Sequence, residues 1–177
     1  MSADEQVDVV DENDCVVQRT TRREVRAHNL RHRGVYILVF NSAGQLLVHQ
    51  RTPTKDIFPA YWDVSIGGVV AAGESYDDAA RRELAEEIGF NAVPLRRLFP
   101  VRYEDAATRV CGMVYSCTCD DQPQLQAAEI AAAEWADFDV VLERAQHQQF
   151  CPDGLEVLRR YLSKLEAALK AQVGGDD

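Results

Sequence analysis

The chain has no apolar run long enough to cross a membrane, and its first eight residues are too polar for a signal peptide. We therefore expect a cytoplasmic protein. No internal repeat, linker or low-complexity block divides the 177 residues. A chain of this length can bury about 70% of its unfolded surface, which favours one domain over 1–177.

The chain is also poor in cysteine and in positive charge. Its five cysteines are odd in number and scattered, and none forms a Cys-x-x-Cys pair, so we expect free thiols in a reducing compartment. Nineteen lysines and arginines face 29 aspartates and glutamates, which gives a net charge of −10. A nucleic-acid polymer is therefore a poor partner, whereas a small diphosphate is compatible if metal ions supply positive charge.

The most informative segment is 68–90, where a glycine loop leads into a short predicted helix. Ser75 followed by Asp78 is typical of a capping box, and Gly89 followed by Phe90 is typical of a left-handed helix end. These signals predict a helix from about residue 75 to 88. The apolar stripe of this helix consists of Ala80, Leu84 and Ile88.

Three glutamates crowd one face of that helix near its end. Glu83, Glu86 and Glu87 fall within an arc of about 100°. Like charges at this spacing cost roughly 0.2–0.5 kcal/mol per pair, and negative charge in the last turn opposes the helix dipole by about 0.3–1 kcal/mol per group. Carboxylates crowded in this way suit Mg²⁺ or Mn²⁺, although a solvated acidic face is the simpler alternative.

The neighbouring arginines are not expected to neutralise the glutamates fully. Asp77 can pair with Arg81, and Asp78 with Arg82, each in the favourable acid-first order. The glutamates are then short of partners, and an uncompensated departure from a local rule is typical of a functional site.

The whole segment fills a known motif. Gly68 is followed after five residues by Glu74, and after seven more by Arg82-Glu83, an aliphatic residue, any residue, two glutamates, any residue, glycine and an apolar residue. With nine specified positions filled in one spacing, the segment resembles the Nudix box of the Nudix hydrolase superfamily. The resemblance implies an α/β (α+β) fold, in which an α/β/α sandwich with a mixed sheet carries a metal-binding loop–helix–loop. It also implies metal-assisted hydrolysis of a diphosphate bond in a nucleoside diphosphate linked to another group.

The resemblance also assigns roles within the box. Glu83 and Glu87 resemble the principal metal ligands, and Glu86 a further ligand or the general base. The carbonyl of Gly68 is an additional candidate ligand. Mg²⁺ is the expected cofactor, with Mn²⁺ possible.

Two further assignments rest on the same resemblance. Glu74 and Arg82 resemble an ion pair that shapes the loop. Glu129 is the second candidate for the general base, because it precedes Glu134-Trp135 in a stretch resembling a loop that often contributes an acid. Its alternative role is that of an exposed loop acid.

The segment 51–63 gathers cations and aromatics next to the predicted site. Arg51 and Lys55 are candidates to contact phosphate oxygens, and Phe58 or Trp62 to stack on a base or line an apolar pocket. The alternatives are that the aromatics pack the loop, and that Arg51 pairs with an aspartate of the same segment.

This segment, together with His32-Arg33, resembles the superfamily branch that includes isopentenyl-diphosphate isomerase. The chain has Gly67 where the isomerase needs its catalytic cysteine, and Val69 where it has a histidine ligand. Cysteine chemistry cannot run without the thiol, so we do not expect isomerase activity, and we expect His32 to be structural. A non-catalytic nucleotide-binding module is the third hypothesis, but its usual sign, a degenerate box, is missing. Further departures from the isomerase are Val25, Ala107 and Arg109.

The remaining pattern predicts an extension over 1–30, a core over 31–150, a C-terminal helix over 151–172 and a loose tail over 173–177. The leucines of the last helix could form a dimer seam, although docking on the sheet is the better prediction. The expected helices, besides the box helix, are 21–29 and 153–171. The expected strands are 7–10, 15–19, 34–40, 45–50 (returning antiparallel), 93–103, 108–118 and 135–138.

Overall fold

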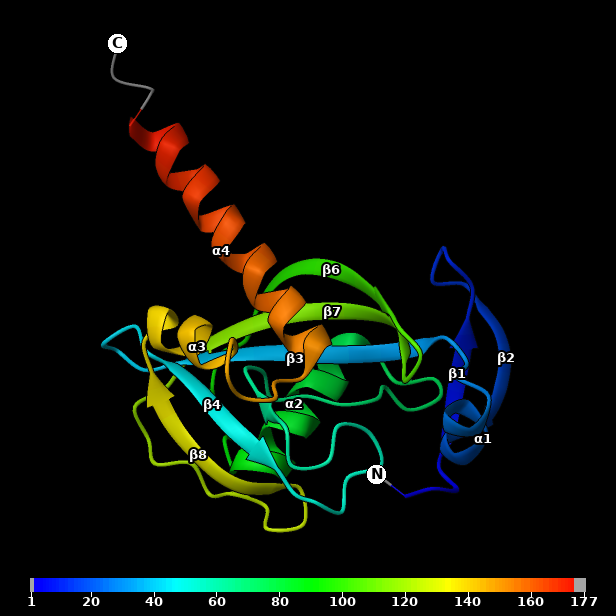
Figure 1. The fold of residues 1–177 in the computed structure, drawn as a ribbon. Coiled ribbons are helices and arrows are strands. Elements are labelled where there is room, and N and C mark those ends of the chain that lie inside the picture. Colours follow the sequence, from blue (N-terminus) through cyan, green and yellow to red (C-terminus); the bar gives the residue numbers. More distant parts are fainter. Residues whose placement is uncertain (1, 174–177) are drawn as a thin grey trace.

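The computed structural model of the chain describes residues 2–173. In this range an eight-stranded mixed sheet carries helices on its faces (Figure 1). The strands are β1 (Gln6–Val10), β2 (Val16–Thr21), β3 (His32–Phe40), β4 (Leu46–Arg51), β5 (Trp62–Asp63), β6 (Arg96–Glu104), β7 (Arg109–Thr118) and β8 (Ile130–Ala136). The helices are α1 (Arg22–Ala27), α2 (Tyr76–Ile88), α3 (Phe138–Arg144) and α4 (Pro152–Val173).

The strand β3 organises the sheet, and it pairs in parallel with β7 from His32↔Val110 to Phe40↔Thr118. The expected antiparallel return of β4 is present, but β3 and β4 pair at one position, Phe40↔Leu46. Beyond it β4 pairs with β8, while two residues that flank the glycine pair at the start of the box form bridges to β3, at Ile37↔Ile66 and Gly34↔Val69. The glycine loop therefore lies directly against the central strand.

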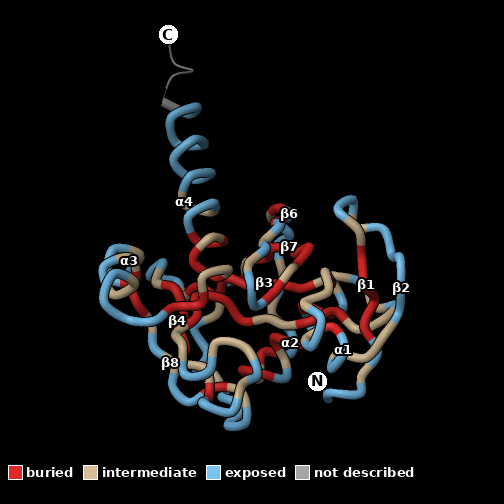
Figure 2. The backbone as a smooth tube through the Cα atoms, turned by 45° about the vertical axis from the view of Figure 1, so that its right-hand side comes forward, coloured by how far each residue is buried: buried red, intermediate tan, exposed pale blue. Residues whose placement is uncertain are grey.

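Two apolar layers confirm the predicted α/β/α sandwich. On one face of the sheet, the predicted stripe of α2 is buried against side chains such as Ile37 and Tyr115. On the other face, Val141 of α3 and Leu158 of α4 pack with Leu38 and neighbouring residues. Figure 2 shows that the buried chain is concentrated in the strands and in the helix surfaces that meet them.

One predicted strand was placed too far along the chain. The sequence predicted a short strand over 135–138, but β8 ends at Ala136 and Phe138 is the first residue of α3. The ring of Phe138 packs edge-on against Phe40, with 6.0 Å between centroids, and also lies next to Tyr161. Because this aromatic contact joins residues far apart in the chain, local strand propensity misplaced the boundary.

The C-terminal helix docks on the sheet through its first turns, as predicted. Leu155 and Leu158 are buried, whereas Leu165 and Leu169 keep 39% and 61% of their area exposed. The distal half of α4 extends away from the sheet (Figures 1 and 2). A dimer seam on these leucines stays a prediction, and positions 174–177 of the expected tail lie outside the described residues. No helix in the range 2–173 combines the length and apolarity needed to span a membrane.

Candidate active site

Local signals place α2 where the sequence predicted it. The Ser75 hydroxyl accepts a hydrogen bond from the backbone N–H of Asp78 at 3.1 Å, and Gly89 ends the helix in the left-handed conformation at φ 77°. The preceding loop is held by β1, because Gly73 donates its N–H to the carboxylate of Asp8 at 2.9 Å. Both ends of the box are therefore fixed by specific hydrogen bonds.

The structure joins Glu74 to Arg82 and extends this pair into the glutamate cluster. The guanidinium of Arg82 binds both oxygens of Glu74, at 2.9 and 3.0 Å, and also donates to Glu83 at 2.6 Å. A third, longer contact reaches Glu86 at 3.4 Å. Arg82 thus partly neutralises the cluster, more than the sequence suggested.

The expected acid-first pairs of α2 were wrong. Arg82 turns onto the glycine loop, since a half-buried bidentate carboxylate outcompetes an exposed neighbour on the helix. Asp78 instead lies 3.4 Å from Arg81, and Asp77 accepts a hydrogen bond from the hydroxyl of Tyr115 on β7.

The three glutamates differ sharply in exposure. Glu83 and Glu87 are buried, with 7% and 6% of their area exposed, whereas the Glu86 side chain keeps 49%. Burial, reinforced by the charge of Glu83, raises the pKa of Glu87 to about 8. Burial also raises the pKa of Glu83, against the opposing effect of Arg82. Two carboxyl groups in this state would gain from a neighbouring cation.

Gly68 lets the loop pass close to the carboxylate of Glu83 on the helix. A Cβ at this position would lie 2.7 Å from Oε1 of Glu83, so a side chain would push the carboxylate away. The Gly68 carbonyl accepts the N–H of Val35 at 2.9 Å, which leaves its second lone pair for another partner.

The donor set fits a hard divalent cation that is completed by substrate and water. Across residues 2–173, no three His, Cys, Asp or Glu side chains converge as a ready-made metal cluster. Mg²⁺ commonly uses one or two carboxylates, several waters and substrate phosphates instead of an all-protein cage. Glu83, Glu87 and the carbonyl of Gly68 suit that mode.

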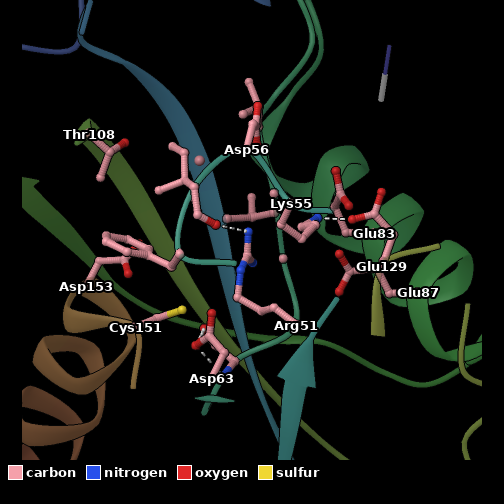
Figure 3. A pocket seen from close by; sticks show the side chains of 18 of the residues that line it. Arg51, Lys55, Asp56, Asp63, Glu83, Glu87, Thr108, Glu129, Cys151 and Asp153 are labelled. Atoms are coloured by element: carbon pink, nitrogen blue, oxygen red, sulfur yellow. Dashed lines mark hydrogen bonds and ion pairs between the residues drawn. The ribbon is translucent and has the colours of Figure 1, made fainter. Parts of the chain in front are cut away.

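These groups line a cavity of about 410 Å³ that also receives residues from β3, β4, α1 and the loop after β4. Figure 3 shows Glu83, Glu87 and Glu129 gathered next to Lys55. The ammonium of Lys55 forms an ion pair with Glu129, so this acid is not simply a loop residue exposed to solvent.

Arg51 and Phe58 reach the same cavity, but Trp62 does not. The Arg51 guanidinium donates to the carbonyl of Ile57 at 3.0 Å and pairs with neither aspartate of its segment. Trp62 packs next to Phe150 on the other side, with the guanidinium of Arg144 4.4 Å from its ring centroid. Trp62 therefore has a packing role, which was the alternative to its binding a substrate base.

Sequence reasoning missed the acidic end of the cavity. Asp63, Cys151 and Asp153 lie on the far side of Arg51 from the glutamates (Figure 3). The Tyr36 hydroxyl donates to Asp153 at 3.0 Å, and burial together with the charge of Asp153 raises the pKa of Asp63 to about 6. Asp63 is about 90 positions from Cys151 and Asp153 in the chain, so no local sequence spacing could have placed them in one site.

The N-terminal helix was also missed as part of the site. Arg22 and Arg26 of α1 line the cavity, although the sequence predicted only a helix over 21–29 with no role in the site. His32 lines the same space as the first residue of β3, buried with its Nδ1 3.0 Å from the carbonyl of Leu30. This geometry agrees with the structural role expected for His32.

Comparison with known proteins places the chain in a family. Residues 30–160 match the model of the NUDIX domain. An uncharacterised Nudix hydrolase of Pseudomonas aeruginosa is 42% identical, over 86% of this chain and 90% of that protein. Another from Streptomyces coelicolor is also 42% identical and spans 98% of this chain and 97% of its own length.

Solved structures agree on the fold. A crystal structure of a Deinococcus radiodurans protein has a TM-score of 0.78 and 33% identity, and covers 88% of this chain and 98% of that one. The NUDIX domain of Shewanella oneidensis NrtR, solved with ADP ribose, has a TM-score of 0.61 at 21% identity, over 75% of this chain and 86% of that one, and supports the fold alone. The domain match and the full-length relatives together show that the chain belongs to the Nudix family.

Proposed function

We propose that the chain hydrolyses a phosphoanhydride bond in a small nucleoside diphosphate-type metabolite, in the cytoplasm and with Mg²⁺ as cofactor, Mn²⁺ being a possible substitute. One observation carries the proposal. Two buried glutamates with raised pKa values share a cavity with Arg51 and Lys55, so sites for a cation and for phosphate oxygens adjoin each other. The Nudix hydrolases among the relatives support the same reaction class.

Each residue has a distinct task in this reaction. Glu83, Glu87 and the Gly68 carbonyl would hold the cation, which when bound lowers the pKa of a water and neutralises phosphoryl charge. Arg51 and Lys55 bind phosphate oxygens and orient the diphosphate. Water attacks one phosphorus and the P–O bond of the bridging oxygen breaks, so a nucleoside diphosphate gives a monophosphate and orthophosphate.

The general base is one of two carboxylates. Glu86 lines the cavity, is half-exposed, and has a long contact with Arg82 at 3.4 Å. Glu129 also lines the cavity but forms an ion pair with Lys55. The variants Glu86→Gln and Glu129→Gln distinguish the two candidates. Loss of the general base should remove the acidic limb of the pH profile of kcat, while KM stays near the wild-type value.

The rival reaction gains no support. A cysteine introduced at Gly67 would place its Cβ 2.0 Å from the carbonyl oxygen of Val35, so the backbone would have to move before the isomerase thiol could fit. Only a measurement of turnover distinguishes the hydrolase from a non-catalytic nucleotide-binding module.

The test is a product assay on the purified chain with Mg²⁺, and with EDTA as the blank. The panel contains nucleoside diphosphates and triphosphates, dinucleotides, ADP-ribose, NADH, coenzyme A and isopentenyl diphosphate. We expect phosphate release from a nucleoside diphosphate, which disappears in EDTA and in Glu87→Gln. Isomer formation without phosphate release would favour the rival, and tight nucleotide binding without turnover would favour the binding module.

A further inference from the structure

The N-terminal unit, residues 2–29, precedes the segment matched by the family model, yet its helix α1 forms part of the cavity wall. Arg22 and Arg26 are four residues apart and therefore share one face of α1. Their side chains keep 19% and 21% of their area exposed, whereas Arg23 between them keeps 65% and pairs with Asp4 on the surface. The helix thus turns two of its arginines inward.

The position of α1 is fixed by packing. Val25 lies between the two arginines, is 1% exposed, and packs with Val7, Val9 and Val69. Val69 directly follows Gly68 of the box. The inward arginines therefore keep a defined position relative to the glycine loop.

Two arginines of the cavity wall, Arg26 and Arg51, have too few partners. Asp56 lies 2.8 Å from Arg22 but 3.7 Å from Nε of Arg26, and Nη1 of Arg26 reaches the hydroxyl of Thr108 at 3.4 Å. Nε of Arg26 and Nε of Arg51 are both buried without a hydrogen-bond partner in the described structure. A buried donor left unpaired is costly, and an anion with several oxygens would satisfy both.

Electrostatics points the same way. Burial, together with the positive charges of Arg22 and Arg51, lowers the pKa of Arg26 to about 10 against the opposing effect of Asp56. Arg51 lines the same cavity as Glu87, Lys55 and the α1 arginines, and its positive charge acts on both Glu87 and Arg26. The cavity therefore offers two neighbouring positions for anionic groups, one near Glu87 and Lys55 and one near Arg26.

We propose that Arg22 and Arg26 of α1, together with Arg51, bind a phosphoryl group of the substrate other than the one held at the glutamates. The N-terminal unit then supplies binding residues for the second phosphoryl group of the phosphoanhydride. Asp56 acts as the internal competitor that neutralises the arginines until the substrate displaces it. The inference rests on the proposed function for its substrate class.

The test uses inorganic pyrophosphate as the probe and isothermal titration calorimetry on the intact chain in EDTA, where the glutamates hold no cation. We expect Arg26→Gln, which keeps an amide donor for Thr108, to weaken pyrophosphate binding about tenfold or more. Arg23→Gln is the matched control on the same helix and should bind within about twofold of wild type. Wild-type affinity in Arg26→Gln, or no pyrophosphate binding by the wild-type chain, would overturn the inference.

A second variant changes affinity in the opposite direction and so separates binding from mere loss of folding. Asp56→Asn removes the competing carboxylate, so pyrophosphate should bind several-fold more tightly even if the melting temperature falls. Weaker binding in Asp56→Asn would show that the arginines serve only to dock α1. Arginine-dependent binding with no turnover of any substrate would instead sink the hydrolase proposal and leave this subsite standing.

Discussion

Replacing Glu87 with glutamine should raise stability and abolish activity at once, because the two effects have the same electrostatic origin. Glu87 is 6% exposed and its pKa is about 8 instead of 4.5. At pH 7 the unfolded glutamate is ionised while the folded one retains its proton. The folded state therefore loses up to about 3 kcal/mol relative to an unperturbed glutamate.

The sign of the pH dependence follows from the raised pKa. Since the folded state binds the extra proton, metal-free wild type should lose stability as pH rises from about 4.5 to about 8. Glutamine carries no such proton, so Glu87→Gln should be flatter across this range. The pKa of about 8 already includes the opposing charge of Lys55, and we expect Glu87→Gln to gain about 1–3 kcal/mol at pH 7, or several degrees in Tm.

Urea unfolding in EDTA at pH 5, 7 and 8 measures this pH-dependent difference in the free energy of unfolding. The control is Glu166→Gln, at an exposed position of α4. Millimolar Mg²⁺ should stabilise wild type by about 1 kcal/mol at tenfold excess over Kd, and Glu87→Gln by much less. Turnover should fall by at least about a hundredfold. A Glu87→Gln protein that is less stable in EDTA, or that turns over at the wild-type rate, would refute the metal assignment.

Three further changes test other parts of the structure. Asp63→Asn should raise the free energy of unfolding by about 1–3 kcal/mol at pH 7.5 and leave it unchanged at pH 4. The reason is that the raised pKa of Asp63, about 6, makes folding less favourable only above the pKa of the unfolded chain. Equal shifts at both pH values in urea titrations would contradict this. Gly68→Ala should reduce kcat/KM at least about tenfold and raise the Mg²⁺ concentration needed for half-maximal rate, since its methyl group displaces the Glu83 carboxylate. An unchanged Mg²⁺ titration would argue against Gly68 and Glu83 as neighbours of the cation. Leu169→Glu should halve the sedimenting mass of a homodimer built on α4 without changing Tm, and an unaltered mass would place the dimer seam elsewhere.

The parts of the site that the sequence revealed are those encoded locally. The cap at Ser75, the left-handed Gly89 and the glutamate spacing lie within one short segment, so their geometry follows from helix periodicity. Even there, local rules failed for Arg82, which leaves its helix neighbour Asp78 for the half-buried Glu74. Tertiary burial decided that competition.

What the sequence could not show are contacts between distant segments. The parallel pairing of β3 with β7 joins residues about 78 positions apart, and it brings Thr108 under the arginines of α1. Likewise, Asp63 and Asp153 meet only because β5 lies against the start of α4, where an added Cβ at Gly154 would lie 2.3 Å from the Asp63 carboxylate. Hydrophobic periodicity predicts which face of an element is buried but not which element covers it.

The cavity therefore combines one local motif, the box, with wall residues from segments far apart in the chain. The two parts have different consequences for function. The box supplies Glu83 and Glu87, which suit a cation that would bind the diphosphate common to many substrates. The rest of the cavity wall supplies Arg26 from α1, which precedes the segment matched by the family model, and Asp63 and Asp153 from the opposite side. Because differential affinity for the non-shared part of a substrate sets specificity, variation in α1 and at the start of α4 should change which metabolite is bound while the hydrolytic step stays the same.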